Sequence, residues 1–114
     1  MIVLAHRFFF RKGFLAIALW PFIFIKHKHL KEDAVFINHE RIHLRQQIEL
    51  LVVFFYVWYV LEFFFRWLQY KHRYKAYRNI SFEREAYANE ANLQYLENRS
   101  LWCFIHFFFE KPLP

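Results

Sequence analysis

The pattern H-E-x-x-H at residues 39–43 is the part of this sequence best suited to chemistry. It contains His39, Glu40 and His43. Residues four apart on a helix face the same side, so the two imidazoles can bind one Zn²⁺ at about 2.0–2.1 Å. Glu40 is rotated by one residue, which lets it take a proton from a water at the metal without becoming a ligand. The pattern predicts a zinc-dependent hydrolytic site with Glu40 as general base.

Two histidines leave such a site incomplete, because a catalytic zinc has three protein ligands and keeps its fourth position for water. The obvious source of a third ligand is the segment 82–90, which reads Phe-Glu-Arg-Glu-Ala-Tyr-Ala-Asn-Glu. Gln46 lies one turn beyond His43 on the same side of the predicted helix, so we expect it to hydrogen-bond a ligand.

An H-E-x-x-H helix followed by a helix with E-x-x-x-D/N resembles the glutamate-zincins, metallopeptidases whose third ligand is a downstream Glu. Over about residues 32–95 the chain is most similar to the membrane-embedded peptidase domain of the beta-lactam sensor-transducers, which carries an E-R-E-L-A-C-D-E run. Residues 83–90 match that run at both leading Glu, at Arg84 and at the final Glu. The resemblance implies a zinc peptidase in contact with a membrane.

Carried over to this sequence, the resemblance implies that Glu85 is the third zinc ligand. Asn89 then takes the place of the Asp that hydrogen-bonds a ligating His, and this departure removes a charge beside the metal. The alternative frame makes Glu83 the ligand and puts Tyr87 in the Asp position. We expect Glu85, because Asn can orient an imidazole and Tyr is bulkier at that spacing.

The composition favours helices around this site. The chain has 114 residues with one Gly and three Pro, and none of these four lies between residues 22 and 111. Its 58% hydrophobic content excludes a disordered chain, and its single Cys excludes a disulfide framework. We therefore predict one mostly α domain over residues 1–114, in which the H-E-x-x-H helix packs against a glutamate helix.

Several elements can be placed along the chain. Asp33 or Glu32 can begin the H-E-x-x-H helix, and Asn79 or Ser81 can cap a helix from 82 to about 97. A last apolar piece covers 101–109. Residues 22–26 are the candidate for a short N-terminal strand.

The apolar segment 50–68 is a candidate transmembrane helix, interrupted only by Glu62 and Arg66. The net charge of +6 favours phospholipid headgroups over nucleic acid as the anionic partner. We expect a membrane location without a cleaved signal peptide, since basic residues interrupt the first residues and no small-residue cleavage site follows. So much apolar surface on a small chain also favours a larger protein partner.

A straight helix conflicts with the zinc site. From His43 to Leu68 it would run about 37 Å, and few residues then remain to bring Glu85 back. The segment must bend, and its midpoint at 62–63 is the candidate turn, although no Gly or Pro marks it.

Two function hypotheses follow. The first is a membrane-associated zinc metallopeptidase with His39, His43 and Glu85 on the metal. The alternative is a non-catalytic small membrane subunit of a larger assembly, in which the motif is vestigial or holds a structural metal.

Overall fold

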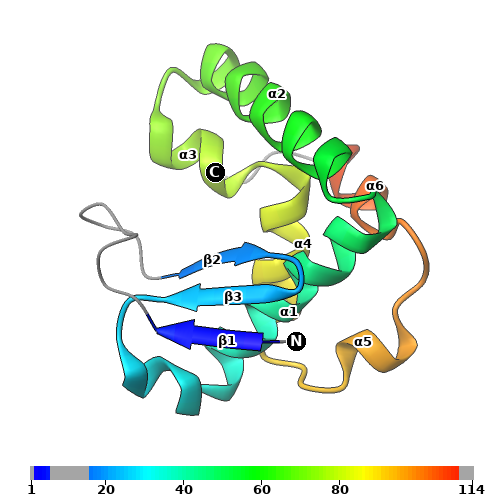
Figure 1. The fold of residues 1–114 in the computed structure, drawn as a ribbon. Helices are drawn as coiled ribbons and strands as arrows, with labels where there is room; N and C mark the ends of the chain where they lie inside the picture. The colour runs from blue at the N-terminus through cyan, green and yellow to red at the C-terminus, as the bar shows by residue number, and fades with distance from the viewer. Residues whose placement is uncertain (1, 6–15, 111–114) are drawn as a thin grey trace.

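The computed structural model describes residues 2–5 and 16–110 and shows a small sheet beside a set of helices (Figure 1). The sheet has the order β1-β3-β2, with β1 (Ile2–Ala5) parallel to β3 (Phe22–Ile25) and β2 (Ala16–Leu19) antiparallel to it. The strand expected at 22–26 is confirmed as β3. Alternate residues of β3, Ile23 and Ile25, are buried against the helices, as the two-residue period of a strand requires.

A short 3₁₀ helix, η2 (Lys28–Glu32), leads into α1 (Ala34–Glu49). Asp33 begins α1 as predicted, because its carboxylate accepts the Phe36 N–H at 3.1 Å. The H-E-x-x-H pattern lies in the middle of this helix.

The chain bends by 112° between α1 and α2 (Val53–Tyr70). Leu51 and Val52 make the bend with φ values of 56° and 61°, a region that residues other than Gly seldom occupy. The turn expected at 62–63 is wrong, since both residues lie inside α2. The bend occurs earlier, shortly after the H-E-x-x-H part of α1, so α2 runs back beside that part of α1 instead of away from it.

The rest of the chain consists of short helices: α3 (Arg73–Arg78), α4 (Ser81–Asn89), α5 (Tyr95–Asn98) and α6 (Phe104–Phe108). The single helix expected from 82 to about 97 is therefore two helices. Asn38 on α1 holds the break between them, because its side-chain amide donates to the carbonyls of Glu90 and Asn92 at 2.8 and 2.9 Å. The prediction of a mostly α fold with a short N-terminal strand is confirmed.

An aromatic cluster joins α2, α4 and α6. The ring of Phe82 lies 4.5 Å from that of Phe55 and 4.6 Å from that of Phe104, measured between centroids, and all three side chains are buried. Such ring pairs add to the free energy of burial. The cluster fixes α4 against α2 and so sets which side of α4 faces α1.

Glu62 and Arg66, the two charges of the apolar segment, point into the protein. The Glu62 carboxylate accepts the Ser81 backbone N–H at 2.7 Å and the Ser81 hydroxyl at 2.6 Å, so it binds the N-terminus of α4. Arg66 pairs with Glu62 at 3.4 Å.

Within the described residues, α1 and α2 have the length and apolar composition of a membrane span only when taken together across their bend, and neither has them alone.

Candidate metal centre

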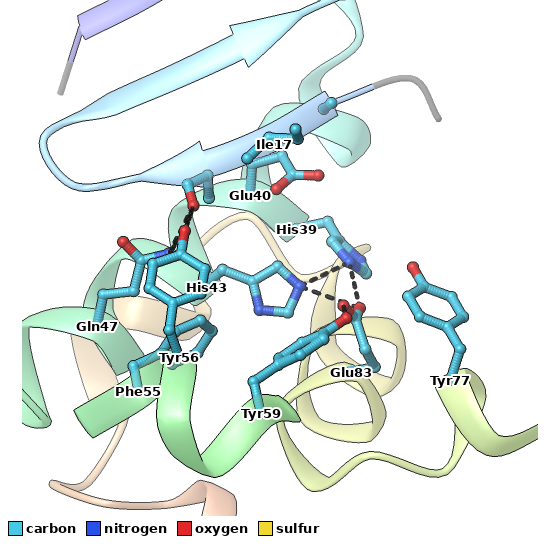
Figure 2. A pocket seen from close by; sticks show the side chains of 12 residues that line it. Ile17, His39, Glu40, His43, Gln47, Phe55, Tyr56, Tyr59, Tyr77 and Glu83 are labelled. Atoms are coloured by element: carbon cyan, nitrogen blue, oxygen red, sulfur yellow. Dashed lines mark hydrogen bonds and ion pairs between the residues drawn. The ribbon is translucent and has the colours of Figure 1, made fainter. Parts of the chain in front are cut away.

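Three side chains from two helices meet at one point (Figure 2). The Nε2 atoms of His39 and His43 on α1 are 3.2 Å apart, and Oε1 of Glu83 on α4 lies 3.2 and 3.0 Å from them. A tetrahedral metal with bonds of 2.0–2.1 Å separates its ligand atoms by about 3.3 Å. The three buried atoms therefore have the spacing of ligands to one metal ion.

Gln46 fixes the orientation of His43. Its side-chain oxygen lies 2.9 Å from His43 Nδ1, and an amide oxygen only accepts, so Nδ1 carries the hydrogen. In the neutral ring, the lone pair is then on Nε2, the atom that faces Glu83. The predicted role of Gln46 as a partner of a ligand agrees with this geometry.

The structure brings Glu83, and not the expected Glu85, to the histidines. Residues two apart on a helix are turned by about 200°, so the two glutamates of α4 face different neighbours. Glu85 accepts a hydrogen bond from the Gln46 amide at 2.9 Å and is paired with the guanidinium of Arg99. It therefore supports the residue that orients His43 and does not itself reach the metal position.

Arg99 makes this support rigid. Its buried guanidinium binds Glu85 and also Glu49 at the end of α1, the latter at 2.6 Å. One cation thus joins α1, α4 and the segment after α5. The contacts of Arg99 with Glu49 and Glu85 could not be predicted from a spacing pattern, because the three residues are far apart in the sequence.

Asn89 does not have the role that the resemblance implies. Its side-chain amide donates to the Glu85 carbonyl of its own helix at 2.9 Å. The carboxylate behind His39 belongs instead to Glu90, whose Oε2 is 3.7 Å from His39 Nδ1. Tyr87, the alternative for that position, packs its ring against the His39 imidazole with centroids 4.5 Å apart.

Tyr59 on α2 orients the Glu83 carboxylate. Its hydroxyl donates to Oε2 of Glu83 at 2.7 Å, which leaves Oε1 directed at the histidines. Nothing in the sequence singles Tyr59 out among the aromatic residues of the apolar segment.

Charge is balanced at the three ligand atoms. Burial by itself lowers the pKa of His43, but the adjacent Glu83 carboxylate outweighs burial and raises the pKa of His43 to about 9. For Glu83, burial acts in the opposite direction and raises the pKa. The charge of His43 and the hydrogen bonds from both histidines outweigh burial and bring the pKa of Glu83 well below its usual value. Without a metal, a proton on His43 holds the pair together, and a divalent cation can take its place.

Glu40 lies next to these ligands and lines the same pocket. The pocket has a volume of about 200 Å³ and lies between α1 and β2, with Tyr59 and Tyr77 on its wall. No described residue hydrogen-bonds the Glu40 carboxylate, which points toward β2 in Figure 2. Burial raises the pKa of Glu40 more than the two histidines lower it. An unpaired carboxylate of this kind is suited to accept a proton.

Comparisons of the chain with models of known protein families, with curated proteins and with solved structures find no match. The similarity to glutamate-zincins stays a prediction from short motifs, and function has to be inferred from the geometry of the site.

Proposed function

We propose that this protein is a zinc-dependent peptidase in which His39, His43 and Glu83 hold the metal and Glu40 is the general base. The observation that carries the proposal is the convergence of three potential ligand atoms beside a pocket that also contains the Glu40 carboxylate, which has no hydrogen-bond partner among the described residues. Two imidazoles and one carboxylate are a donor set typical of catalytic zinc.

An open position supports catalysis over a purely structural metal. Structural zinc sites have four protein ligands, whereas catalytic sites have three and leave one position to water or substrate. Here three ligands adjoin a pocket of about 200 Å³. When bound, the metal would polarise a carbonyl and lower the pKa of a water.

The residues of the chain have distinct tasks in this proposal. Glu40 takes the proton of the attacking water and returns it to the leaving amine. Gln46 keeps the hydrogen of His43 on Nδ1, and Tyr59 keeps Glu83 turned toward the histidines. These contacts exist before substrate binds, so little reorganisation is needed during the reaction.

An extended peptide fits the pocket as a substrate. Among the described strands, β2 lies at one edge of the sheet, and Ala16, Ile17 and Ala18 line the pocket. Gln47 and Tyr56 bind the Ala18 carbonyl on this edge, and Gln47 donates at 2.8 Å. A peptide can add to the remaining edge as a further strand, with main-chain hydrogen bonds and little demand on its side chains.

The test compares Glu40→Gln with Glu97→Gln, which changes an exposed glutamate outside the pocket. Wild type and both variants should carry about one zinc per chain by elemental analysis. On a library of unstructured peptides read by mass spectrometry, Glu40→Gln should lose at least about 100-fold in rate, and Glu97→Gln should not. Equal cleavage by wild type and Glu40→Gln would refute the role of Glu40.

The alternative is a non-catalytic subunit with a structural metal, and the large exposed apolar surface of α2 favours it. In that case zinc is present, wild type cleaves no peptide of the library, and Glu40→Gln behaves as wild type in every assay.

A further inference from the structure

The outward face of α2 is apolar over the whole length of the helix. Leu61 is 65% exposed and Leu68 is 80% exposed, and with their exposed apolar neighbours they form a contiguous patch of the kind that marks an interaction site. The other large apolar residues exposed on this helix are Val53, Phe54, Val57, Val60, Phe64, Phe65 and Trp67. The opposite face, with Phe55 and Glu62, is buried, so only the outward face is available to a partner.

The apolar surface continues onto α6. A groove between α2 and α6 is lined by Phe54, Leu61, Phe65 and Phe108, among others, and Phe109 beyond it is 79% exposed. In Figure 1, α2 lies along one margin of the molecule and α6 adjoins its N-terminal end. We call this surface, made by the exposed apolar residues of α2 together with Phe108 of α6 and the following Phe109, the α2–α6 face.

One end of the α2–α6 face is basic. Lys71 and Arg73 are exposed directly after α2. From residue 51 to residue 80, Glu62 is the single acidic residue, and it is buried in its contacts with Arg66 and Ser81. The exposed charge in this part of the chain is therefore positive.

Aromatic residues also gather at this basic end. Trp67 and Tyr74 are exposed there. Trp and Tyr with Lys and Arg beside an apolar surface are typical of the boundary between membrane and water.

We propose that the α2–α6 face docks on an anionic phospholipid bilayer, with α2 lying in the interface and Lys71 and Arg73 on the headgroups. An interfacial helix of this kind buries its apolar face about 5–10 Å deep. Charge complementarity favours lipid over a second copy of the chain, since the exposed residues of α2 and α6 include no carboxylate for Lys71 and Arg73, and Glu110, beyond α6, is paired with Arg84 at 3.3 Å. The docking does not depend on catalysis.

Docking in this way places the metal pocket at the membrane surface. Phe55 and Tyr59 on the buried side of α2 line that pocket. The pocket would thus lie directly behind the helix that contacts lipid, on the side away from the acyl chains.

The test is flotation of the full chain with vesicles of phosphatidylcholine alone or with about one third phosphatidylglycerol. We expect flotation with the anionic vesicles and at least about tenfold weaker partitioning for the double variant Leu61→Asp/Phe65→Asp. Leu93→Asp, at an exposed leucine outside α2 and α6, is the matched control and should float as wild type.

A second pair of variants tests the charge. Lys71→Gln/Arg73→Gln should weaken binding to anionic vesicles by about fivefold for each charge removed. Lys28→Gln/Lys31→Gln on η2, at the far side of the molecule in Figure 1, should leave it unchanged. Circular dichroism and the thermal unfolding midpoint, measured in parallel, show that each variant is folded.

Three results would overturn the proposal. One is a wild-type chain that stays with the unbound fraction for both vesicle types, and another is equal flotation of wild type and Leu61→Asp/Phe65→Asp. The third is a dimer in light scattering without lipid that the same double variant converts to monomer, which would assign the face to a second copy.

Discussion

Metal binding at this site has to displace a proton from His43, and this makes the metal affinity depend steeply on pH. The pKa of His43 is raised to about 9, chiefly by the Glu83 carboxylate acting against burial. A protonated imidazole has no lone pair to give a metal, so the proton and the metal compete for Nε2.

The size of the competition follows from the pKa. With a value of about 9, about one chain in 100 has a neutral His43 at pH 7, and about one in 10 at pH 8. The apparent zinc affinity should therefore rise about tenfold from pH 7 to pH 8. A histidine with its ordinary pKa of about 6.5 would give only a factor of about 1.3 over the same interval.

Competition with a chromophoric chelator, corrected for the proton affinity of the chelator, measures this slope at pH 6, 7 and 8. Calorimetry in buffers of different ionisation enthalpy should count about one proton released per zinc at pH 7. His29→Ala, at an exposed histidine away from the site, should show the wild-type slope. A zinc affinity that changes less than twofold from pH 7 to pH 8 would refute the protonated His43–Glu83 pair.

Three further predictions concern the residues around the site. Glu83→Gln should weaken zinc binding at least about 100-fold in a chelator competition, whereas Glu85→Gln should still reach one zinc per chain at saturation, at reduced folding stability. Glu62→Gln should lower the free energy of unfolding in urea by about 2–4 kcal/mol, because the bonds to the α4 N-terminus weaken and Arg66 loses its buried partner. Without metal, the stability that His43 contributes is fully present below about pH 6.5 and is lost as pH rises through about 9, so the thermal midpoint of chelator-treated protein should fall over that interval.

The elements of the site could largely be predicted from sequence because they depend on local rules. The four-residue spacing of His39 and His43 places both imidazoles on one side of α1, and Asp33 marks the start of that helix. The strand at Phe22–Ile25 follows from a short apolar run beside a Pro.

The choice between Glu83 and Glu85 could not be made in the same way. Both lie on α4, and the rotation of α4 about its axis decides which of them faces α1. That rotation is set by contacts distant in sequence, of Glu62 with Ser81 and of Arg99 with Glu85. No periodicity within the nine residues of α4 contains this information.

The position of the bend between α1 and α2 could not be predicted from the sequence either. Leu51 and Val52 are ordinary helix or strand residues by propensity, and neither favours a positive φ. Packing of α2 against α3 and α4 imposes the bend, and a local reading of the sequence puts it at the midpoint of the apolar segment instead.

The buried group formed by Arg99 with Glu85 and Glu49 sets an order of events during synthesis of the chain. Two of the three grouped side chains, His39 and His43 on α1, leave the ribosome 44 and 40 residues before Glu83. Even then, Glu49 and Glu85 lack their cation until residue 99 has emerged. The side chains that support the His39–His43–Glu83 group are thus complete only when the chain has been synthesised through residue 99, and until then Glu49 and Glu85 are carboxylates without their cation.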